Sequence, residues 1–299
     1  MKAAVTLWKF SRPHTIIGSV ISIFTLYMIM CEKGALQHLD LLLLAVIIGV
    51  CCNVFIVGIN QVADVDIDKI NKPYLPIASG SLSLRDAKII TYGALAVSLL
   101  FAWSLSIHLF YIIALAGAIG WAYSMPPFHF KKHHVTAAFS ITFVRGVLIN
   151  VGGFLVFNYL INKTIGLPEN VIILTVFIIV FSLVISWFKD LPDMEGDSQY
   201  HIKTLAIASS PKAVFIAGTV LVTMTYLMTV ILKFPAVVNP DPFVEDVILF
   251  YGNLLLMILF LINAFTIDLA KQRSIQKFYK RFWWFFFAEY LVYLVAYCY

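Results

Sequence analysis

Long apolar runs recur along the whole chain, and they restrict its possible folds more than any other feature. A helix needs about 20 residues, at 1.5 Å each, to cross a hydrocarbon core of about 30 Å. Nine runs come close to this length: residues 16–31, 41–62, 89–105, 110–123, 136–159, 171–188, 213–232, 247–266 and 282–299. The sequence therefore predicts an all-α, polytopic membrane protein, built as a bundle of nine transmembrane helices in one domain spanning residues 1–299.

The composition excludes a water-soluble globule. Hydrophobic residues make up 61% of the chain and charged residues only 12%, against about 45–50% and about 25% in soluble domains. The net charge of +5 could suggest nucleic acid as a partner, but the basic residues are spread between apolar runs and form no dense patch with interleaved aromatic residues. The expected partner is the lipid bilayer, and no nucleic acid is expected.

The distribution of basic residues tests the number of spans. Polar residues Ser104, Ser106 and His108 predict a turn that divides the third span from the fourth. With nine spans, nearly all Lys and Arg residues fall on one side, leaving only Lys33, Lys163 and Lys233 on the other. Because basic loops stay cytoplasmic, this base-rich side is predicted to be cytoplasmic, or stromal in a plastid. We expect a multi-pass protein of a bacterial, cyanobacterial-type membrane or of a plastid membrane.

Acidic residues are scarce, yet they concentrate in two segments on the base-rich side. The first is NQVADVDID, residues 60–68. In a helix at 100° per residue, Asn60, Asp64 and Asp68 fall within about 80° of one another, whereas Asp66 points elsewhere. These three side chains are therefore expected to converge at the end of the second span.

The second acidic segment is KDLPDMEGD, residues 189–197. The same geometry places Asp190, Asp193 and Asp197 within about 60° if the preceding apolar helix continues through them. Glu195 points away from this group. Both segments are thus expected at one mouth of the bundle.

Converging carboxylates require a compensating positive charge. Two of them 4 Å apart repel by about 4 kcal/mol at an effective dielectric constant of 20. Hard oxygen ligands select Mg²⁺ or Ca²⁺, and Mg²⁺ is typically held by a few carboxylates together with phosphate oxygens. Two clusters suggest Mg²⁺ ions bridging a diphosphate. Alternatively, each cluster is solvated or pairs with nearby lysines, but two clusters on one face favour the metal site.

Basic side chains on the same face could contact a diphosphate. They are Lys72, Lys131, Lys132 and Lys189. Arg145 differs because it lies ten residues past Val135, about 15 Å into its span, where a charge is costly without a partner. Its partner is either a structural ion pair or an anion or polar head group in an interior cavity, and we favour the second.

Five runs carry a further signal: WKFSRPHTIIG (8–18), NQVADVDIDKINKPYLPIASG (60–80), AYSMPP (122–127), FKDLPDMEGD (188–197) and FYKRFWWFFFAEYL (278–291). Together they resemble the UbiA superfamily of intramembrane prenyltransferases and, within it, the homogentisate prenyltransferase branch. The resemblance touches nearly the whole chain. It implies nine transmembrane helices with two Asp-rich motifs at one mouth.

The resemblance also implies roles for individual residues. It makes Asn60, Asp64 and Asp68 the first Mg²⁺–diphosphate motif, and Asp190, Asp193 and Asp197 the second. Diphosphate-contacting positions are expected at Lys72, Tyr123 and Lys131, with Lys132, Lys189, Arg12 and Arg145 as further candidates. An alternative for Tyr123 is an anchor in the aromatic belt at the membrane surface.

The activity implied by the resemblance is transfer of a phytyl or geranylgeranyl group from a prenyl diphosphate to a small aromatic acceptor. Homogentisate is the expected acceptor, with loss of its carboxylate as CO₂, in the formation of tocopherol and prenylquinone precursors. The depth of Arg145 in its span, independently of the resemblance, makes Arg145 or another base in the cavity the expected partner of that carboxylate. Other acceptors, such as a flavonoid, coumarin or hydroxybenzoate, remain alternatives. A transporter is a further alternative, which predicts matching broken helices or an inverted repeat.

Overall fold

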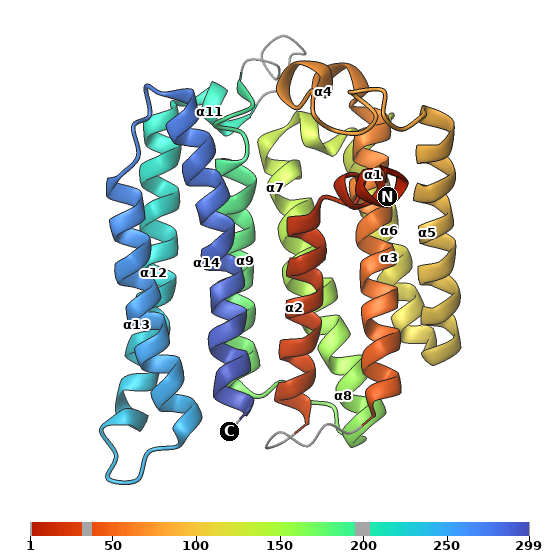
Figure 1. The fold of residues 1–299 in the computed structure, drawn as a ribbon. Helices are drawn as coiled ribbons and strands as arrows, with labels where there is room; N and C mark the ends of the chain where they lie inside the picture. Colours follow the sequence, from red (N-terminus) through yellow and green to blue (C-terminus); the bar gives the residue numbers. More distant parts are fainter. Residues whose placement is uncertain (1, 32–37, 195–203, 299) are drawn as a thin grey trace.

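The computed structural model describes residues 2–31, 38–194 and 204–298, and every regular element in that part of the chain is a helix. The long helices run side by side through the molecule (Figure 1). They are α2 (Pro13–Met30), α3 (Leu39–Ala63), α5 (Leu84–Leu105), α6 (Ile107–Ser124), the continuous run of α7 (His134–Thr142), η2 (Phe143–Gly153) and α8 (Phe154–Asn162), α9 (Glu169–Phe188), α12 (Pro211–Val237), α13 (Val244–Phe265) and α14 (Gln272–Cys298). The short elements are α1 (Lys2–Phe10), α4 (Val65–Asn71), η1 (Phe130–Lys132) and α11 (Leu205–Ala208).

The predicted all-α membrane bundle is confirmed. Each of the nine predicted spans overlaps a long helix, and the run α7–η2–α8 serves as a single span. Within the described residues, 8 helices are long and apolar enough to cross a membrane. The last long helix, α14, falls outside this group because its apolar part carries Glu289 among Tyr and Trp side chains. The chain is thus a multi-pass membrane protein, and the count of nine spans stays a prediction.

The predicted turn between the third and fourth spans is present. Helix α5 ends at Leu105 and α6 begins at Ile107. Ser106 lies between them in an extended conformation, and its Oγ accepts a hydrogen bond from the backbone N–H of His108 at 3.2 Å. A serine N-cap of this kind satisfies one of the free amide groups at the start of a helix. The short polar interruption is therefore enough to reverse the chain.

The long helices close into a ring. Helix α2 packs against α3, α3 against α6, α6 against η2, and the α7–η2 run against α9; α9 then contacts α12, α12 contacts α13, and α13 contacts α14. The ring closes because α14 packs against α2, while α5 lies outside it against α3 and α6 (Figure 1). Segments far apart in sequence therefore meet at each end of the bundle.

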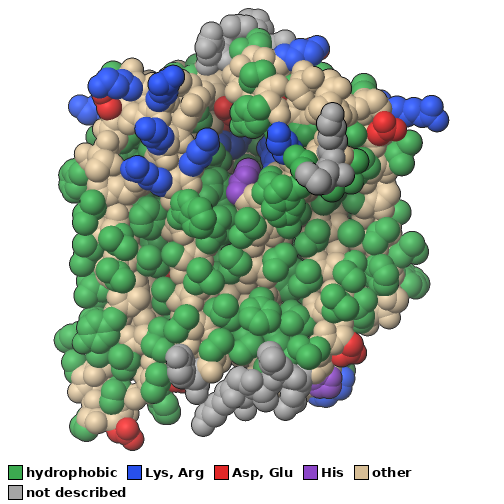
Figure 2. All heavy atoms as spheres, viewed as in Figure 1, with side chains coloured by type: hydrophobic (Ala, Val, Ile, Leu, Met, Phe, Trp, Pro, Cys, Tyr) green, Lys and Arg blue, Asp and Glu red, His purple; other side chains and the backbone are tan. Residues whose placement is uncertain are grey.

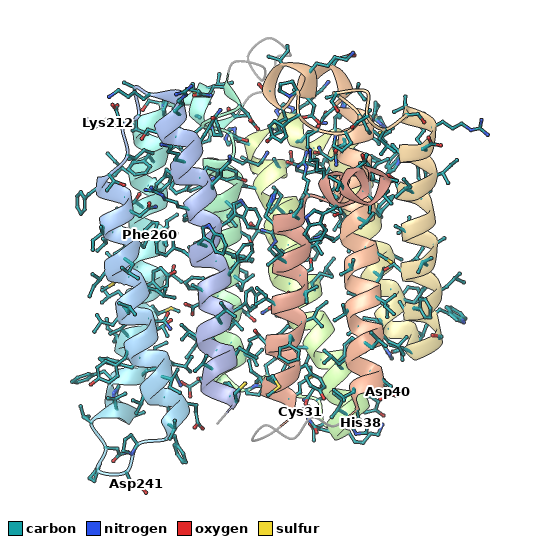
Figure 3. All side chains as sticks on the ribbon, in the orientation of Figure 1. Cys31, His38, Asp40, Lys212, Asp241 and Phe260 are labelled. Atoms are coloured by element: carbon teal, nitrogen blue, oxygen red, sulfur yellow. The ribbon has the colours of Figure 1, made fainter. Side chains whose placement is uncertain are left out.

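The two ends of the bundle differ in what they carry. One end holds α4 and α11 together with Lys212, whereas Cys31, His38, Asp40 and Asp241 lie at the opposite end (Figures 1 and 3). We call the first of these the motif end. Lys and Arg side chains gather there above a broad apolar belt, with a histidine in a hollow between them (Figure 2). The uneven distribution of charge agrees with that expected from the sequence.

Glu289 is an acid buried inside the bundle, away from both ends of α14. Its side chain is fully buried and interacts with Asn253 of α13, yet neither carboxylate oxygen makes a well-aligned hydrogen bond with a described residue. Tyr226 and Tyr293 lie nearby, and their hydroxyl groups also lack partners there. An ionised carboxylate at such depth costs about 3 kcal/mol or more.

We therefore expect Glu289→Gln to leave the melting temperature of the purified protein unchanged or to raise it by a few degrees, because the amide keeps the shape and cannot ionise. Thermal unfolding in detergent measures this. Glu245→Gln, at the start of α13, is the control for loss of an acid at a more exposed position. A drop of several degrees in Glu289→Gln alone would show that the charged carboxylate stabilises the bundle.

Candidate active site

The first acidic motif lies at a break between two helices. Helix α3 ends at Ala63 and α4 begins at Val65, with Asp64 between them at φ −105° and ψ 18°. The prediction of one continuous helix is therefore wrong at this residue. The backbone N–H of Asp64 still donates to the carbonyl of Asn60 at 3.0 Å, and that of Asp68 to the carbonyl of Asp64 at 2.8 Å. These bonds preserve the four-residue spacing on which the predicted convergence depends.

The side chains of the first motif face a common space. Asn60 donates from Nδ2 to Asp64 Oδ2 at 2.8 Å, and the charges of Asp64 and Asp68 interact. Asp68 is buried, with 5% of its surface exposed. Asp66 is exposed and pairs with Lys69 instead, in agreement with the prediction that it points elsewhere.

The second acidic motif lies in a turn after α9. The helix ends at Phe188, and the chain then turns through residues 189–193, so the predicted continuation of the helix is wrong here. Pro192 explains the end, because proline lacks the N–H that would donate to Phe188 and disfavours a helical conformation at the preceding residue. Asp190 is buried, and the N–H of Asp193 donates to its carbonyl at 3.2 Å. Asp197 lies outside the described residues.

An ion pair joins the two motifs. Lys72, which follows α4, pairs with Asp193, 121 positions further along the chain. The charge of Asp193 also acts on Asp68. The sequence predicts that acidic residues far apart in the chain share one pocket. In the structure, Asp68 and Asp193 lie together at the motif end and not at opposite ends of the bundle.

Two more lysines pair with motif carboxylates. Lys131 of η1 pairs with Asp64, and these side chains are 8% and 13% exposed. Lys189 lies with its Nζ 3.0 Å from Asp190 Oδ1. An ammonium group therefore neutralises each of the carboxylates of Asp64, Asp190 and Asp193, which offsets the repulsion that the sequence predicts.

Burial shifts the pKa of two of these groups. Burial raises the pKa of Asp68 to about 6. The positive charges of Arg12 and Lys72 oppose this rise, and the negative charges of Asp64 and Asp193 add to it. Burial lowers the pKa of Lys131, although Asp64 opposes this change. Both directions show that charge is held here at a desolvation cost, as in many functional sites.

Arg12 reaches the first motif from the N-terminal end of α2. Its backbone is left-handed, with φ 51° and ψ 84°, a conformation that is uncommon outside glycine and is often held in place at functional sites. Its Nη2 donates to Asn60 Oδ1 at 3.1 Å. Arg12 thus adds a positive charge to the site.

The remaining predicted site residues lie at different distances from the motifs. Tyr123, at the end of α6, has its ring centroid 5.9 Å from Lys189 Nζ. Lys132 is exposed and makes no ion pair with any described residue, so it lies at the rim. Arg145 is separate from the motif carboxylates, and its guanidinium lies over two aromatic rings of α14.

Tyr279 of α14 was missed from the sequence. Its phenol interacts electrostatically with Lys189, Asp193 and Arg12, so it borders the site. The run FYKRFWWFFFAEYL carries the resemblance, but a stretch so rich in aromatic residues does not show which ring faces inward. Only the packing of α14 against α2 and α13 distinguishes them.

Metal-binding groups are present, although not as a preformed cluster. Within the residues that the structure describes, no three His, Cys, Asp or Glu side chains are grouped closely enough to hold a metal ion. The donor types nevertheless suit Mg²⁺, since they are carboxylate and amide oxygens. The carboxylate of Asp68 is buried and takes part in none of the ion pairs among the described residues, so it is available to a further cation.

Comparison with known proteins assigns the chain to a family. Residues 21–286 match the model of the UbiA prenyltransferase family. The homogentisate phytyltransferase of Synechocystis is 36% identical over 301 residues, which cover 99% of this chain and 96% of that protein. The chloroplastic homogentisate phytyltransferase 1 of Arabidopsis thaliana is 33% identical over 295 residues, covering 95% and 73%.

A solved structure shares the fold. The UbiA homolog from Archaeoglobus fulgidus, bound to GPP and Mg²⁺, superposes with a TM-score of 0.65 at 18% identity, covering 97% of this chain and 99% of that one. The family match and the two relatives each extend over most of the chain. The chain therefore belongs to the UbiA prenyltransferase family.

Proposed function

We propose that this protein is a Mg²⁺-dependent aromatic prenyltransferase that transfers a phytyl or geranylgeranyl group from its diphosphate to homogentisate. The ion pair between Lys72 and Asp193 carries the proposal, because it brings the two acidic motifs into one site at the motif end. The names of the relatives from Synechocystis and Arabidopsis thaliana support the acceptor. The GPP and Mg²⁺ bound to the Archaeoglobus fulgidus homolog support the donor and the metal.

The proposed metal ligands are the oxygen atoms of the two motifs. Asn60, Asp64 and Asp68 form one set, and Asp190, Asp193 and Asp197 form the other. Bound Mg²⁺ supplies positive charge that neutralises the departing diphosphate. The lysines that now pair with Asp64 and Asp193 can bind the diphosphate oxygens of the donor, because both kinds of contact are charge-assisted hydrogen bonds.

The proposed reaction divides between the polar mouth and the apolar bundle. As the allylic C–O bond breaks, the charge on the leaving diphosphate is stabilised by Lys72, Lys131 and Lys189. Further contacts come from Arg12, Lys132 and Tyr123. The surrounding helices exclude water from the allylic cation. A carbon of the electron-rich phenol ring then forms the new C–C bond and loses its proton. The acetate side chain loses CO₂, and its remaining carbon takes up a proton to become a methyl group.

The position of the site in the membrane is also part of the proposal. We place the motif end on the cytoplasmic or stromal side, because basic side chains gather there (Figure 2) and basic loops are retained on that side. The ring closes only when α2 and α14 meet, so residues 1–299 are proposed to act as one domain.

A matrix of acceptors against donors tests the proposed activity. Purified protein in lipid vesicles would be given Mg²⁺, one prenyl diphosphate of a stated chain length, and homogentisate, naringenin, a coumarin or hydroxybenzoate. We expect a prenylated, decarboxylated quinol from homogentisate with C20 donors, detected by mass spectrometry. Product from another phenol alone would reassign the acceptor, and no product in any cell of the matrix would refute the proposal.

Removal of divalent metal should stop turnover. With excess EDTA, we expect prenyl-quinol formation to fall by about 10³-fold or more, because the charge on the leaving diphosphate is then compensated by side chains alone. Adding Mg²⁺ back beyond the chelator should restore the rate, and the same amount of Na⁺ should not. Turnover that persists in EDTA would contradict the metal assignment without affecting the assignment of the aromatic acceptor.

A further inference from the structure

Arg145 is a cation for which no described residue supplies an anion. It lies in η2, the π-helical middle of its span, where an unpaired charge is costly. Its Nη1 atom is buried and has no hydrogen-bond partner in the described parts of the chain. None of the ion pairs formed there includes Arg145. The guanidinium therefore lacks the counter-charge that its position demands.

Two rings of α14 determine which part of the guanidinium stays available. The Cζ atom of Arg145 lies 5.4 Å from the ring centroid of Trp283 and 5.4 Å from that of Phe286. Aromatic rings attract a guanidinium through its faces, whereas its N–H groups point outward in the plane. The N–H edge left here matches a carboxylate, which accepts two parallel hydrogen bonds.

A second donor lies beside the first. Trp283 is buried, and its Nε1 makes no well-aligned hydrogen bond with a described residue, although the Tyr279 hydroxyl lies close enough to interact with it. His14 of α2 packs against the Trp283 ring, with centroids 4.8 Å apart and planes at 66°, and so helps to fix its orientation. Two adjacent donor atoms, both buried and neither in a well-aligned hydrogen bond with a described residue, form a site suited to a small anion.

This pair of donors adjoins the diphosphate site. Tyr279 interacts electrostatically with Arg145 and also with Lys189 and Asp193 of the second motif. Arg145 lies about 15 Å deeper than Val135 along its helix, on the apolar side of the mouth. An aromatic acceptor held here by an acidic side chain would lie between the guanidinium and the diphosphate.

We propose that Arg145 and the Trp283 N–H form a carboxylate subsite that selects aromatic acceptors carrying an acidic side chain. This inference rests on the proposed function and adds to it the group that recognises homogentisate. Arg145 binds the acetate carboxylate in its free N–H plane, and Trp283 donates one further hydrogen bond. A phenol without the carboxylate leaves the guanidinium unpaired and binds poorly for that reason.

Steady-state kinetics with matched acceptors tests the subsite. The variants are Arg145→Gln, Arg145→Lys and Trp283→Phe, with the exposed Arg281→Gln of α14 as the control. For Arg145→Gln we expect the KM for homogentisate to rise by about 30-fold or more, with the KM for the prenyl diphosphate unchanged. Arg145→Lys keeps the charge but loses the planar pair of donors, so its KM should be intermediate. Trp283→Phe should raise the KM less, and Arg281→Gln should not change it.

The methyl ester of homogentisate shows whether the carboxylate is the group that is recognised. We expect wild-type protein to use the ester poorly, and Arg145→Gln to use it no worse than wild type does. If Arg145→Gln and wild type have the same KM for homogentisate, the subsite is refuted while the prenyltransferase assignment stands.

Ligand protection gives a readout that does not depend on turnover. Homogentisate should raise the melting temperature of the wild-type protein, and the ester should not; Arg145→Gln should lose the shift. Loss of the shift in a protein that forms no product would support the subsite and refute the proposed reaction. Absence of any shift in wild type, together with absence of product, would refute both. If Arg145→Gln fails to fold, Arg145→Lys decides the question by the same shift, because it keeps the charge and loses the planar pair of donors; a full wild-type shift in Arg145→Lys would refute the subsite.

Discussion

Replacing Asp64 or Asp193 with alanine should abolish prenyl-quinol formation while the protein still inserts into the membrane. Each change removes one of the oxygen ligands proposed for Mg²⁺ and leaves a lysine without its partner, Lys131 for Asp64 and Lys72 for Asp193. We expect a loss of about 10³-fold or more in kcat/KM for the donor, because stabilisation of the leaving diphosphate depends on this charge arrangement. Product formation in vesicles at matched protein content measures the loss.

Asp66 is the matched control for these two variants. It lies two residues from Asp64 in the same acidic segment, but its side chain is 74% exposed and pairs with Lys69 at 2.9 Å. Asp66→Ala removes the same charge from the motif end without touching the shared pocket, so its activity should stay within about twofold of wild type, as for most exposed ion pairs. Equal losses in Asp64→Ala and Asp66→Ala would mean that overall negative charge matters, and not a specific ligand position.

Much of the fold could be predicted because the thickness of the membrane sets the length of each spanning helix, and its apolar interior sets the composition of that helix. Helices of about 20 apolar residues are one of very few ways to satisfy the backbone in lipid, so each predicted span overlaps a long helix. The turn at Ser106 was visible as a polar interruption. The convergence of Asn60, Asp64 and Asp68 also followed from their spacing, since the i→i−4 backbone bonds persist through the break at Asp64.

The second motif shows where the sequence reasoning fell short. Its helical geometry was extrapolated from the apolar run before it, although Pro192 signals a helix end. Asp190 and Asp193 face the first motif only because a turn after α9 redirects the chain toward Lys72. The contact between Lys72 and Asp193, which are 121 positions apart, depends on how the ring of helices closes. The local spacing of residues carries no information about that closure.

The partners of Arg145 could not be predicted for a similar reason. Its depth in the membrane indicated that the charge of Arg145 needs a partner. The sequence could not decide between an ion pair within the protein and an anion of a ligand. The structure places it over Trp283 and Phe286, residues about 140 positions away whose inward-facing rings are indistinguishable in sequence from those that face lipid. The unpaired N–H edge thus emerges only from where the fold places Arg145 relative to the rings of α14.

The lysines of the site raise the question of what they do when the donor binds. In the structure, Lys131 is nearly buried against Asp64, and burial lowers its pKa. Two roles fit this contact: Lys131 could simply balance the carboxylate, or it could bind the diphosphate once Mg²⁺ takes the carboxylate. These roles predict different responses to added metal.

We expect Lys131→Met to lower kcat/KM for the prenyl diphosphate by about 10²-fold to 10³-fold, because removing one preorganised cation from a leaving diphosphate has an effect of this size. Methionine retains an unbranched apolar stem and removes only the charge. Lys88→Met, at an exposed position near the start of α5, should retain wild-type activity and serves as the control. Lys132→Met, at the rim, should have a much smaller effect than Lys131→Met.

A magnesium titration then separates the two roles of Lys131. If the ammonium contacts the diphosphate, raising Mg²⁺ above saturation leaves the Lys131→Met defect in place, since no metal ligand is missing. If Lys131 only balances Asp64, the freed carboxylate binds Mg²⁺ at least as well as in wild type, and excess metal restores the rate. We expect the defect to persist, because the Lys131 side chain is 8% exposed and its charge lies beside Asp64 and interacts with those of Asp68 and Lys189. Full recovery of the rate at high Mg²⁺ would mean that Lys72 and Lys189, and not Lys131, contact the diphosphate.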